Sequence, residues 1–481
     1  MKRPKYIELF YSLSEKEIKE FGKFINSPFF NESKRLVLLY NYLKKETHKK
    51  RDNISIEAAV SKLFPDHKPN DEDIRKLHSG FSLLIEEFLT IKSLRRHGSQ
   101  QRLFLLKELR KRNLDTIFES KLKEQWSLSF DFRLRTKEYY PDRIKFLKEE
   151  YLYFYFRHET EKATKASAET DRVTELMYLT LKLNVFINER FEGVYGDKQE
   201  KGLTKIESVF NFIETKLRKT VKDEPELYVY YLIAKLIYFK EDVKSVLNIN
   251  KFIAVNKEHI NPDILDYFSN VLFRFCVTRM NLGKYEFSGI AYGIQKEMEN
   301  DGMFDRMREI PNMTFFSVIT IRIYRKETIW AEEFVRKYYG KLNPAVKDET
   351  YRVCMALISF ANKKYSDVIK YSANLKTKNL AYYLFVKSAL LKTYYETGDD
   401  KYIHSTADTI EHYIKRKQEM NEMMKRSVSG FLRYVLKLEK AKKEGGRYVG
   451  ALADMIAEER KFFHSGWVRQ KIKELAEKNR G

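Results

Sequence analysis

The chain of 481 residues carries a net charge of +23, and 43% of its residues are apolar, which is ample for packed cores in a chain too long for one compact core. Its 18 glycines and 9 prolines are too few for the turns that many short strands would need, so the composition excludes a β-rich fold. We therefore predict an all-α protein made of several units or one elongated array.

The N-terminal region, residues 1–112, has clear helix boundaries. Ser14 and Glu17 have the spacing of a capping box, in which each side chain accepts a hydrogen bond from the other residue's backbone amide, and the helix that they open ends before Pro28. Further helix starts are predicted at three capping residues: Asn31, Ser55 and Asn70. We predict a basic helical unit of four helices here.

Two short motifs of this region resemble known sequences. The combination of Ser27-Pro28-Phe29-Phe30-Asn31 with the later Leu63-Phe64-Pro65 is similar to the N-terminal part of uncharacterised proteins from Bacteroidetes-type bacteria. The resemblance implies no function.

Residues 113–225 are predicted to form a connecting region of long charged helices. The run 151–156 is aromatic or apolar throughout, as a buried strand would be, but strong helix formers flank it, so we predict a buried helix. Residues 193–202 contain three glycines and are predicted to be a loop. This loop lacks the Gly-Lys-Ser/Thr ending of a phosphate-binding loop.

From residue 226 onward, pairs of helices follow one another. The first helix of each pair is apolar, and these helices are predicted at 226–239, 263–281, 312–325, 348–361 and 379–396. The second helices are predicted at 241–258, 285–299, 329–340, 366–375 and 401–417. Four turns carry an aromatic residue, with spacings of 45, 35 and 37 residues: Tyr285, Trp330, Tyr365 and Tyr402. We expect Tyr365 and Tyr402 to fill the joints between hairpins.

The second helices resemble those of the tetratricopeptide-like superfamily. Gly283-Lys284-Tyr285, Ser288 and Tyr292 match its turn, its small residue and its later aromatic residue. The first-helix signature of Trp, Leu-Gly and Tyr is missing, and Val368 stands where alanine is expected. The resemblance implies helical hairpins stacked as an irregular α-solenoid over residues 226–420, with a concave surface that binds peptides or proteins. The alternative is an irregular helical bundle.

Positive charge is concentrated at the two ends of the chain. Residues 1–112 contain 25 basic and 15 acidic residues, residues 346–481 contain 28 and 17, and the middle is nearly neutral. Helical spacing places the candidate anion-binding cations of segments 92–112 and 415–447 on shared faces. These cations are Lys92, Arg95, Arg96, Lys107, Arg110, Lys111, Arg433, Lys437 and Lys440. They fit a phosphate or an acidic partner, and the alternative is a solvated lysine face.

Motifs of enzymes, metal sites and membrane proteins are missing from the sequence. His404, Asp408 and His412 lie at helical spacing, but a solvated helix face is favoured over a metal site because no further ligand is near in the sequence. Cys276 and Cys354 form neither a disulfide framework nor a metal-ligand spacing. No uncharged apolar run exceeds seven residues. We therefore expect a cytoplasmic protein without a membrane span, a metal, a cofactor or enzymatic activity.

The sequence thus predicts four segments and one of two binding functions. The segments are a basic helical unit (1–112), a connecting region (113–225), tetratricopeptide-like hairpins (226–420) and basic C-terminal helices (421–481). A non-enzymatic protein-binding or scaffolding role is favoured. The alternative is an RNA-binding protein that uses the two basic segments.

Overall fold

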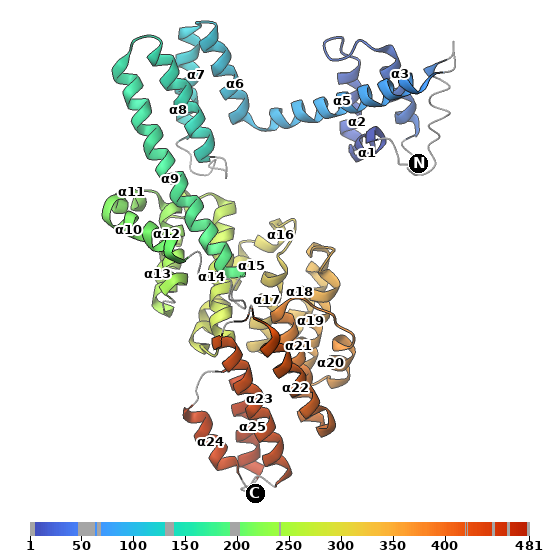
Figure 1. The fold of residues 1–481 in the computed structure, drawn as a ribbon, viewed down its shortest axis with the longest axis vertical. Helices are drawn as coiled ribbons and strands as arrows, with labels where there is room; N and C mark the ends of the chain where they lie inside the picture. The colour runs from blue at the N-terminus through green and yellow to red at the C-terminus, as the bar shows by residue number, and fades with distance from the viewer. Residues whose placement is uncertain are drawn as a thin grey trace. The chain divides into compact units, whose positions relative to one another are not determined.

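The computed structural model describes residues 5–46, 63–64, 69–129, 139–192, 203–239, 242–418, 420, 422–444, 448–458 and 462–478. All regular structure in these ranges is helical, which confirms the all-α prediction. The chain forms two compact units, the first of Met1–Ser127 with Asp142–Ser167 and the second of Leu128–Pro141 with Ala168–Gly481 (Figure 1). The four segments named from the sequence stay a prediction.

The first unit begins with the helices α1 (Lys5–Ser12), α2 (Glu15–Ile25), α3 (Lys34–Lys45) and α5 (Asp71–Arg96). The capping box at Ser14 is confirmed, since its backbone amide donates to Glu17 Oε2 at 2.9 Å and Glu17 N donates to Ser14 Oγ at 3.3 Å. Asn70 forms the same motif at the start of α5. Fully buried rings of Phe10, Phe21 and Phe81 form the core between these helices.

One predicted cap in this unit is wrong, and another lies outside the described residues. Asn31 does not cap α3, because that helix begins after Ser33 and the Asn31 amide instead folds back to donate to the backbone oxygen of Ile25 at 2.9 Å. Asn31 thus closes the turn that follows α2. Ser55 falls in the part of the chain that is not described.

The first unit continues with α6 (Gly98–Lys111), α7 (Asp115–Ser129), α8 (Tyr139–Tyr155) and the start of α9 (Thr160–Glu192). The run 151–156 lies in α8 up to Tyr155, so the predicted helix is confirmed there. The predicted burial is correct only in part, because Tyr155 and Phe156 are 56% and 63% exposed. The Tyr153 ring of α8 stacks on the Phe118 ring of α7 at 4.1 Å between centroids, and both side chains are buried. Loop 193–202 is not among the described residues.

The second unit contains the rest of α9 and the predicted helix pairs. Its helices up to residue 300 are α10 (Leu203–Phe212), a π-helical turn (Ile213–Leu217), α11 (Arg218–Lys222), α12 (Pro225–Phe239), α13 (Val243–Val255), α14 (Pro262–Asn281) and α15 (Ser288–Asn300), with short 3-10 turns at Lys257–His259 and Tyr285–Phe287. They are followed by α16 (Met303–Arg306), α17 (Asn312–Tyr324), α18 (Thr328–Tyr338), a 3-10 turn (Tyr339–Lys341), α19 (Lys347–Ala361), α20 (Tyr365–Ser372), α21 (Leu380–Thr397) and α22 (Asp400–Arg416). The unit ends with α23 (Glu422–Lys443), α24 (Val449–Glu458) and α25 (Ser465–Lys478). All ten helices predicted between 226 and 417 are therefore present.

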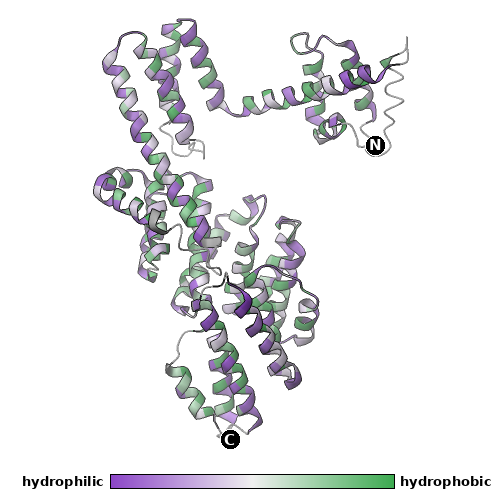
Figure 2. Ribbon diagram, in the orientation of Figure 1, coloured by the Kyte–Doolittle hydropathy of each residue, from purple (hydrophilic) through white to green (hydrophobic). Residues whose placement is uncertain are grey.

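The first helices of the pairs lie inside the unit. Helices α17, α19 and α21 pack on one another in turn, and α21 has no exposed residue before Thr397. The C-terminal helix α25 also packs on the rest of this unit. Trp467 donates its indole N–H to Glu396 Oε1 of α21 at 3.1 Å, and Ser465 lies 3.1 Å from the Tyr285 hydroxyl. Figure 2 shows hydrophobic (green) and hydrophilic (purple) residues alternating along the helices of both units. The inner faces of α17, α19 and α21 thus contact this chain itself.

The turn aromatics do not all fill hairpin joints. The Tyr402 side chain is 48% exposed, and Tyr365 is only half-buried, with its ring against Phe360. In α20 and α22 an aliphatic residue one turn into the helix is buried instead, since Val368 and Ile403 are both inaccessible to solvent. Tyr365 begins α20 and Val368 follows three residues later, whereas Ile403 directly follows Tyr402, the third residue of α22, and projects about 100° away from it.

Candidate binding surfaces

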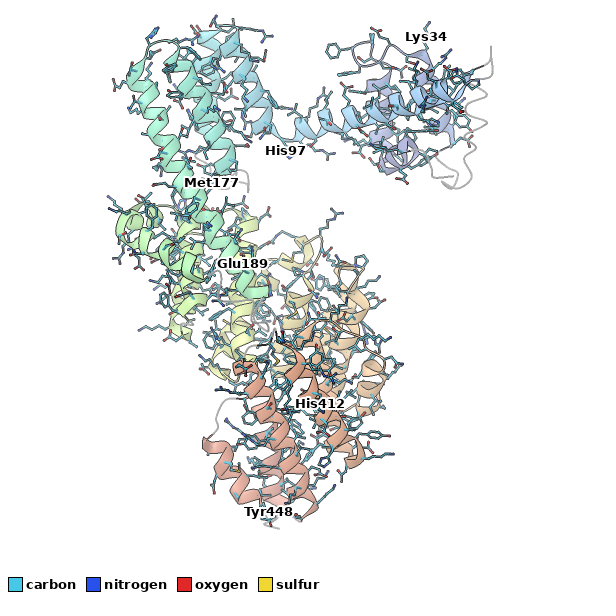
Figure 3. The ribbon with its side chains drawn as sticks, viewed as in Figure 1. Lys34, His97, Met177, Glu189, His412 and Tyr448 are labelled. Atoms are coloured by element: carbon cyan, nitrogen blue, oxygen red, sulfur yellow. The ribbon has the colours of Figure 1, made fainter. Side chains whose placement is uncertain are left out.

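The cations predicted in segment 92–112 lie on two helices, because the helical conformation is interrupted at His97 between α5 and α6 (Figure 3). Lys92 on α5 forms ion pairs with Glu20 at 2.5 Å and Glu17 at 3.2 Å, and Arg96 lies 3.6 Å from Glu17. The first trio therefore holds α5 against α2, with Arg95 beside it on the surface.

The second trio is also largely paired within the protein. Arg110 Nε donates to Glu149 Oε2 of α8 at 2.9 Å, and Lys111 pairs with Glu108 at 3.1 Å. In the described part of the chain, Arg95 and Lys107 are the two predicted cations of this segment that form no ion pair. Few charges of segment 92–112 are thus left for an external anion.

The three C-terminal cations share the outer face of α23. Its other face, formed by Phe431, Val435 and Leu438, is fully buried as the sequence pattern indicates. On the outer face, Lys437 Nζ contacts Met455 Sδ at 3.2 Å, Lys440 lies 3.9 Å from Glu444, and Arg433 is exposed.

The predicted histidine pair belongs to a surface helix. His404 on α22 lies 3.6 Å from Glu439 of α23, while His412 is exposed. Across the described ranges, no three His, Cys, Asp or Glu side chains come together as a metal-binding group. The arrangement supplies no ligand set here.

A pocket that the sequence pattern does not reveal lies where the π-helical turn, α11, α12 and α13 meet. Figure 1 labels these three helices. Its volume is about 590 Å³. Three cations line it, namely Arg218, Lys222 and Lys235, together with one carboxylate, Glu214. The cations come from two helices, so the folded chain brings together charges that are 13 to 17 residues apart.

The carboxylate in this pocket is bound by its neighbours. Glu214 Oε1 accepts hydrogen bonds from Lys235 Nζ at 2.9 Å and from the Tyr231 hydroxyl at 2.8 Å. The bond from Lys235, and then that from Tyr231, lower the pKa of Glu214. Arg218 and Lys222, in contrast, make no hydrogen bond or ion pair through their side chains to any residue that the structure describes.

The rest of the pocket wall is aromatic, aliphatic and polar. The Tyr228 ring meets the Phe252 ring edge to face at 5.0 Å and stacks with Tyr231 at 6.1 Å. Ser245 and Asn248 of α13 add polar groups, and Ser245 donates its hydroxyl to Asp242 at 3.3 Å. The wall can therefore contact a planar ring and hydrogen-bond its edge.

A second surface feature is an apolar face on α9 of the second unit. Leu176, Leu179, Leu183 and Ile187 form the buried face of this helix. Tyr178, Leu181 and Val185, at i, i+3 and i+7, form another face and are 49%, 55% and 51% exposed. This α9 face lies between Met177 and Glu189, which Figure 3 labels. A helix that is apolar on both sides is normally buried on both, so the α9 face is an exception.

Two buried cations complete the candidates for chemistry. Arg322 of α17 is 2% exposed and is bound by Gln295, Glu299 and Glu327. Lys392 of α21 is 7% exposed, and its ammonium lies 4.4 Å from the centroid of the Phe360 ring. Burial lowers the pKa of Lys392 to about 7, and the charge of Glu396 opposes that shift.

A buried imidazole lies near Lys392. The His464 ring packs against Phe385, Phe431 and Phe463, and its Nε2 is buried without a hydrogen-bond partner among the described residues. Burial holds the pKa of His464 well below its usual value, and the charge of Lys392 lowers it further. Neither Lys392 nor His464 lines the pocket beside α11.

The chain has no match among known proteins in three comparisons: no protein-family model, no curated protein and no solved structure matches it. Of the helices that the structure describes, none is long and apolar enough to cross a bilayer.

Proposed function

We propose that this chain is a non-enzymatic, cytoplasmic protein-binding scaffold, and that the α9 face is its docking surface. The proposal includes an irregular α-solenoid of tetratricopeptide-like hairpins in residues 226–420, which positions α9. The succession of contacts from α12 to α14, α17, α19 and α21 supports this arrangement.

The observation that carries the proposal is the exposure of Tyr178, Leu181 and Val185 on one side of a helix whose opposite side is buried. Contiguous apolar surface of this kind marks protein contact sites, because burying it releases ordered water. The concave surface expected along the first helices is a weaker candidate, since α17, α19 and α21 are enclosed by this chain.

The chemistry of the α9 face selects an amphipathic helix as partner. Its three side chains follow a helical stripe, which matches the apolar stripe of a second helix packed against it. Lys182 lies at the edge of the stripe, over the Tyr178 ring, and forms no ion pair with a described residue. We therefore expect an acidic residue beside the apolar stripe of the partner.

The RNA-binding alternative is less well supported. Lys92, Arg96, Arg110 and Lys111 are held by carboxylates of this chain, which reduces the charge available to phosphates.

The test is site-specific photo-crosslinking from position 181 in the cells that produce the protein, followed by mass spectrometry. Affinity capture with the wild-type protein should recover the partner that crosslinking identifies. Capture with Leu181→Glu or Val185→Glu should not recover it. Leu83→Glu, which changes an equally exposed leucine of the first unit, should leave capture unchanged. Recovery of the same proteins by all variants would overturn the proposal. Nucleic acid that co-purifies and is removed by nuclease, together with salt-dependent RNA binding, would favour the alternative.

A further inference from the structure

The pocket between the π-helical turn and α13 has the size of a small-molecule site. Its volume of about 590 Å³ falls within the range of roughly 300 to 1,000 Å³ that ligand pockets usually occupy. Residues of four consecutive elements line it, so the pocket depends on the folded second unit.

The pocket has an excess of positive charge. Arg218, Lys222 and Lys235 face one carboxylate, Glu214, which leaves a net of two positive charges. Lys235 is already bound to Glu214 at 2.9 Å, so the excess resides on Arg218 and Lys222. A phosphate monoester carries a charge of about −1.5 to −2 at neutral pH and would balance it.

The two excess cations are placed to act together. Arg218 and Lys222 are four residues apart and therefore project from the same side of their helix. Lys219 belongs to the same helix but does not line the pocket. The pocket charge thus depends on helix geometry and not on the general basicity of the segment.

The remaining wall suits a flat ring. Tyr228, Tyr231 and Phe252 present aromatic surface, and stacking of a ligand ring on such side chains contributes binding energy. Asn248 lines the same wall, and its side-chain amide makes no hydrogen bond to a described residue. An amide offers a donor and an acceptor to the edge of a heterocycle.

We propose that this pocket binds a nucleoside monophosphate, with the phosphate on Arg218 and Lys222 and the base against Tyr228 and Phe252. Asn248 reads the edge of the base. This site is independent of the proposed protein-binding role of α9.

The proposal is tested by isothermal titration calorimetry of the full-length chain with AMP, GMP, CMP and UMP at low and at physiological salt. At least one nucleotide should bind with a stoichiometry of one and more weakly at higher salt. The matching nucleoside and inorganic phosphate, titrated separately, should each bind at least tenfold more weakly, because each offers half of the contacts. Failure of all four nucleotides to bind, or equal binding by inorganic phosphate, would overturn the proposal.

Variants locate the site. Lys222→Gln should weaken nucleotide binding about tenfold or more, since a charge-assisted hydrogen bond is lost, and Arg218→Gln should do the same. Lys222→Arg should keep most of the affinity. The matched control is Lys219→Gln, which removes the same charge from the same helix and should leave affinity within about twofold. An equal loss in the control and in Lys222→Gln would show non-specific attraction and overturn the assignment.

A ring variant tests the base contact, and a folding control accompanies it. Tyr228→Leu should weaken the nucleotide but leave the weak binding of inorganic phosphate unchanged. Circular dichroism should show unchanged helix content and melting for each variant. Lys222 is exposed, so Lys222→Gln keeps the test decisive if Arg218→Gln or Tyr228→Leu fails to fold.

Discussion

The second unit contains two buried cations in different surroundings. The Arg322 guanidinium donates from Nε to Gln295 at 2.8 Å and from one terminal nitrogen to Glu299 at 2.6 Å, pairs with Glu327 through the other, and lies 3.7 Å from the Trp330 ring centroid. The Lys392 ammonium lies over the Phe360 ring and has no hydrogen bond or ion pair to a described residue.

The difference shows that burial has opposite consequences for a paired and an unpaired charge. Around Arg322, two carboxylates and an amide replace the water that the guanidinium lost, so its charge connects α15, α17 and α18. Around Lys392, an aromatic face replaces only part of the lost hydration, and the neutral amine becomes accessible near neutral pH. One cation therefore organises the fold, while the other destabilises it.

The largest expected effect comes from removing the paired cation. Arg322→Leu should lower the free energy of unfolding by about 3 kcal/mol, because two carboxylates lose their partner, and their partial exposure limits the cost. Urea unfolding followed by circular dichroism measures the loss. Arg325→Leu, at the exposed end of the same helix, should change stability by less than about 1 kcal/mol. Equal effects of the two variants would mean that the Arg322 network contributes little.

Removing the charge of the unpaired cation, Lys392, is expected to raise the free energy of unfolding. Lys392→Met keeps the length of the side chain and its contact with Phe360, and it removes the charge that burial disfavours. Stability at pH 6 should therefore rise by about 2 kcal/mol. Lys387→Met, on a half-buried position of the same helix, serves as control and should have little effect. Loss of stability in Lys392→Met would show that the ammonium has a stabilising partner.

The smallest effect is the pH dependence of that gain. The pKa of an unfolded lysine is 10.5, and burial lowers the pKa of folded Lys392 to about 7. Between these two pH values the unfolded wild type therefore binds more protons than the folded one. Wild-type stability therefore increases with pH over this window relative to the variant. The advantage of Lys392→Met should be full well below pH 7 and should decrease as the pH rises from about 7 towards 10.5. Unfolding curves of both proteins from pH 6 to 10 measure it, and a constant difference would contradict the lowered pKa.

Local patterns predicted most of the helices. Capping residues such as Ser14 and Asn70 and the apolar periodicity after residue 226 placed helix ends within a few residues. These signals arise within one or two helical turns, so they can be read from a single sequence. Asn31 was misassigned because its amide forms contacts in a turn that local spacing does not distinguish from a cap.

Contacts between distant residues could not be predicted in this way. The sequence correctly put Lys92 and Arg110 on helix faces, but their partners Glu20 and Glu149 lie 72 and 39 residues away, and pairing removed most of their free charge. The pocket was missed because residues 113–225 have no net charge, which conceals the local pair Arg218 and Lys222. Lys387 and Lys392 are alike in sequence, and only the packing of helices around α21 makes one of them buried.

The π-helical turn at Ile213–Leu217 sets the direction in which the side chains of α11 project relative to those of α10. A π turn contains one residue more than an α turn, and each residue of a helix advances the direction of its side chains by about 100°. Deleting one residue between 213 and 217 would thus rotate the Arg218 side of the helix by about a quarter of a turn relative to α10. A single-codon deletion would then redirect Arg218 and Lys222 together without changing either residue.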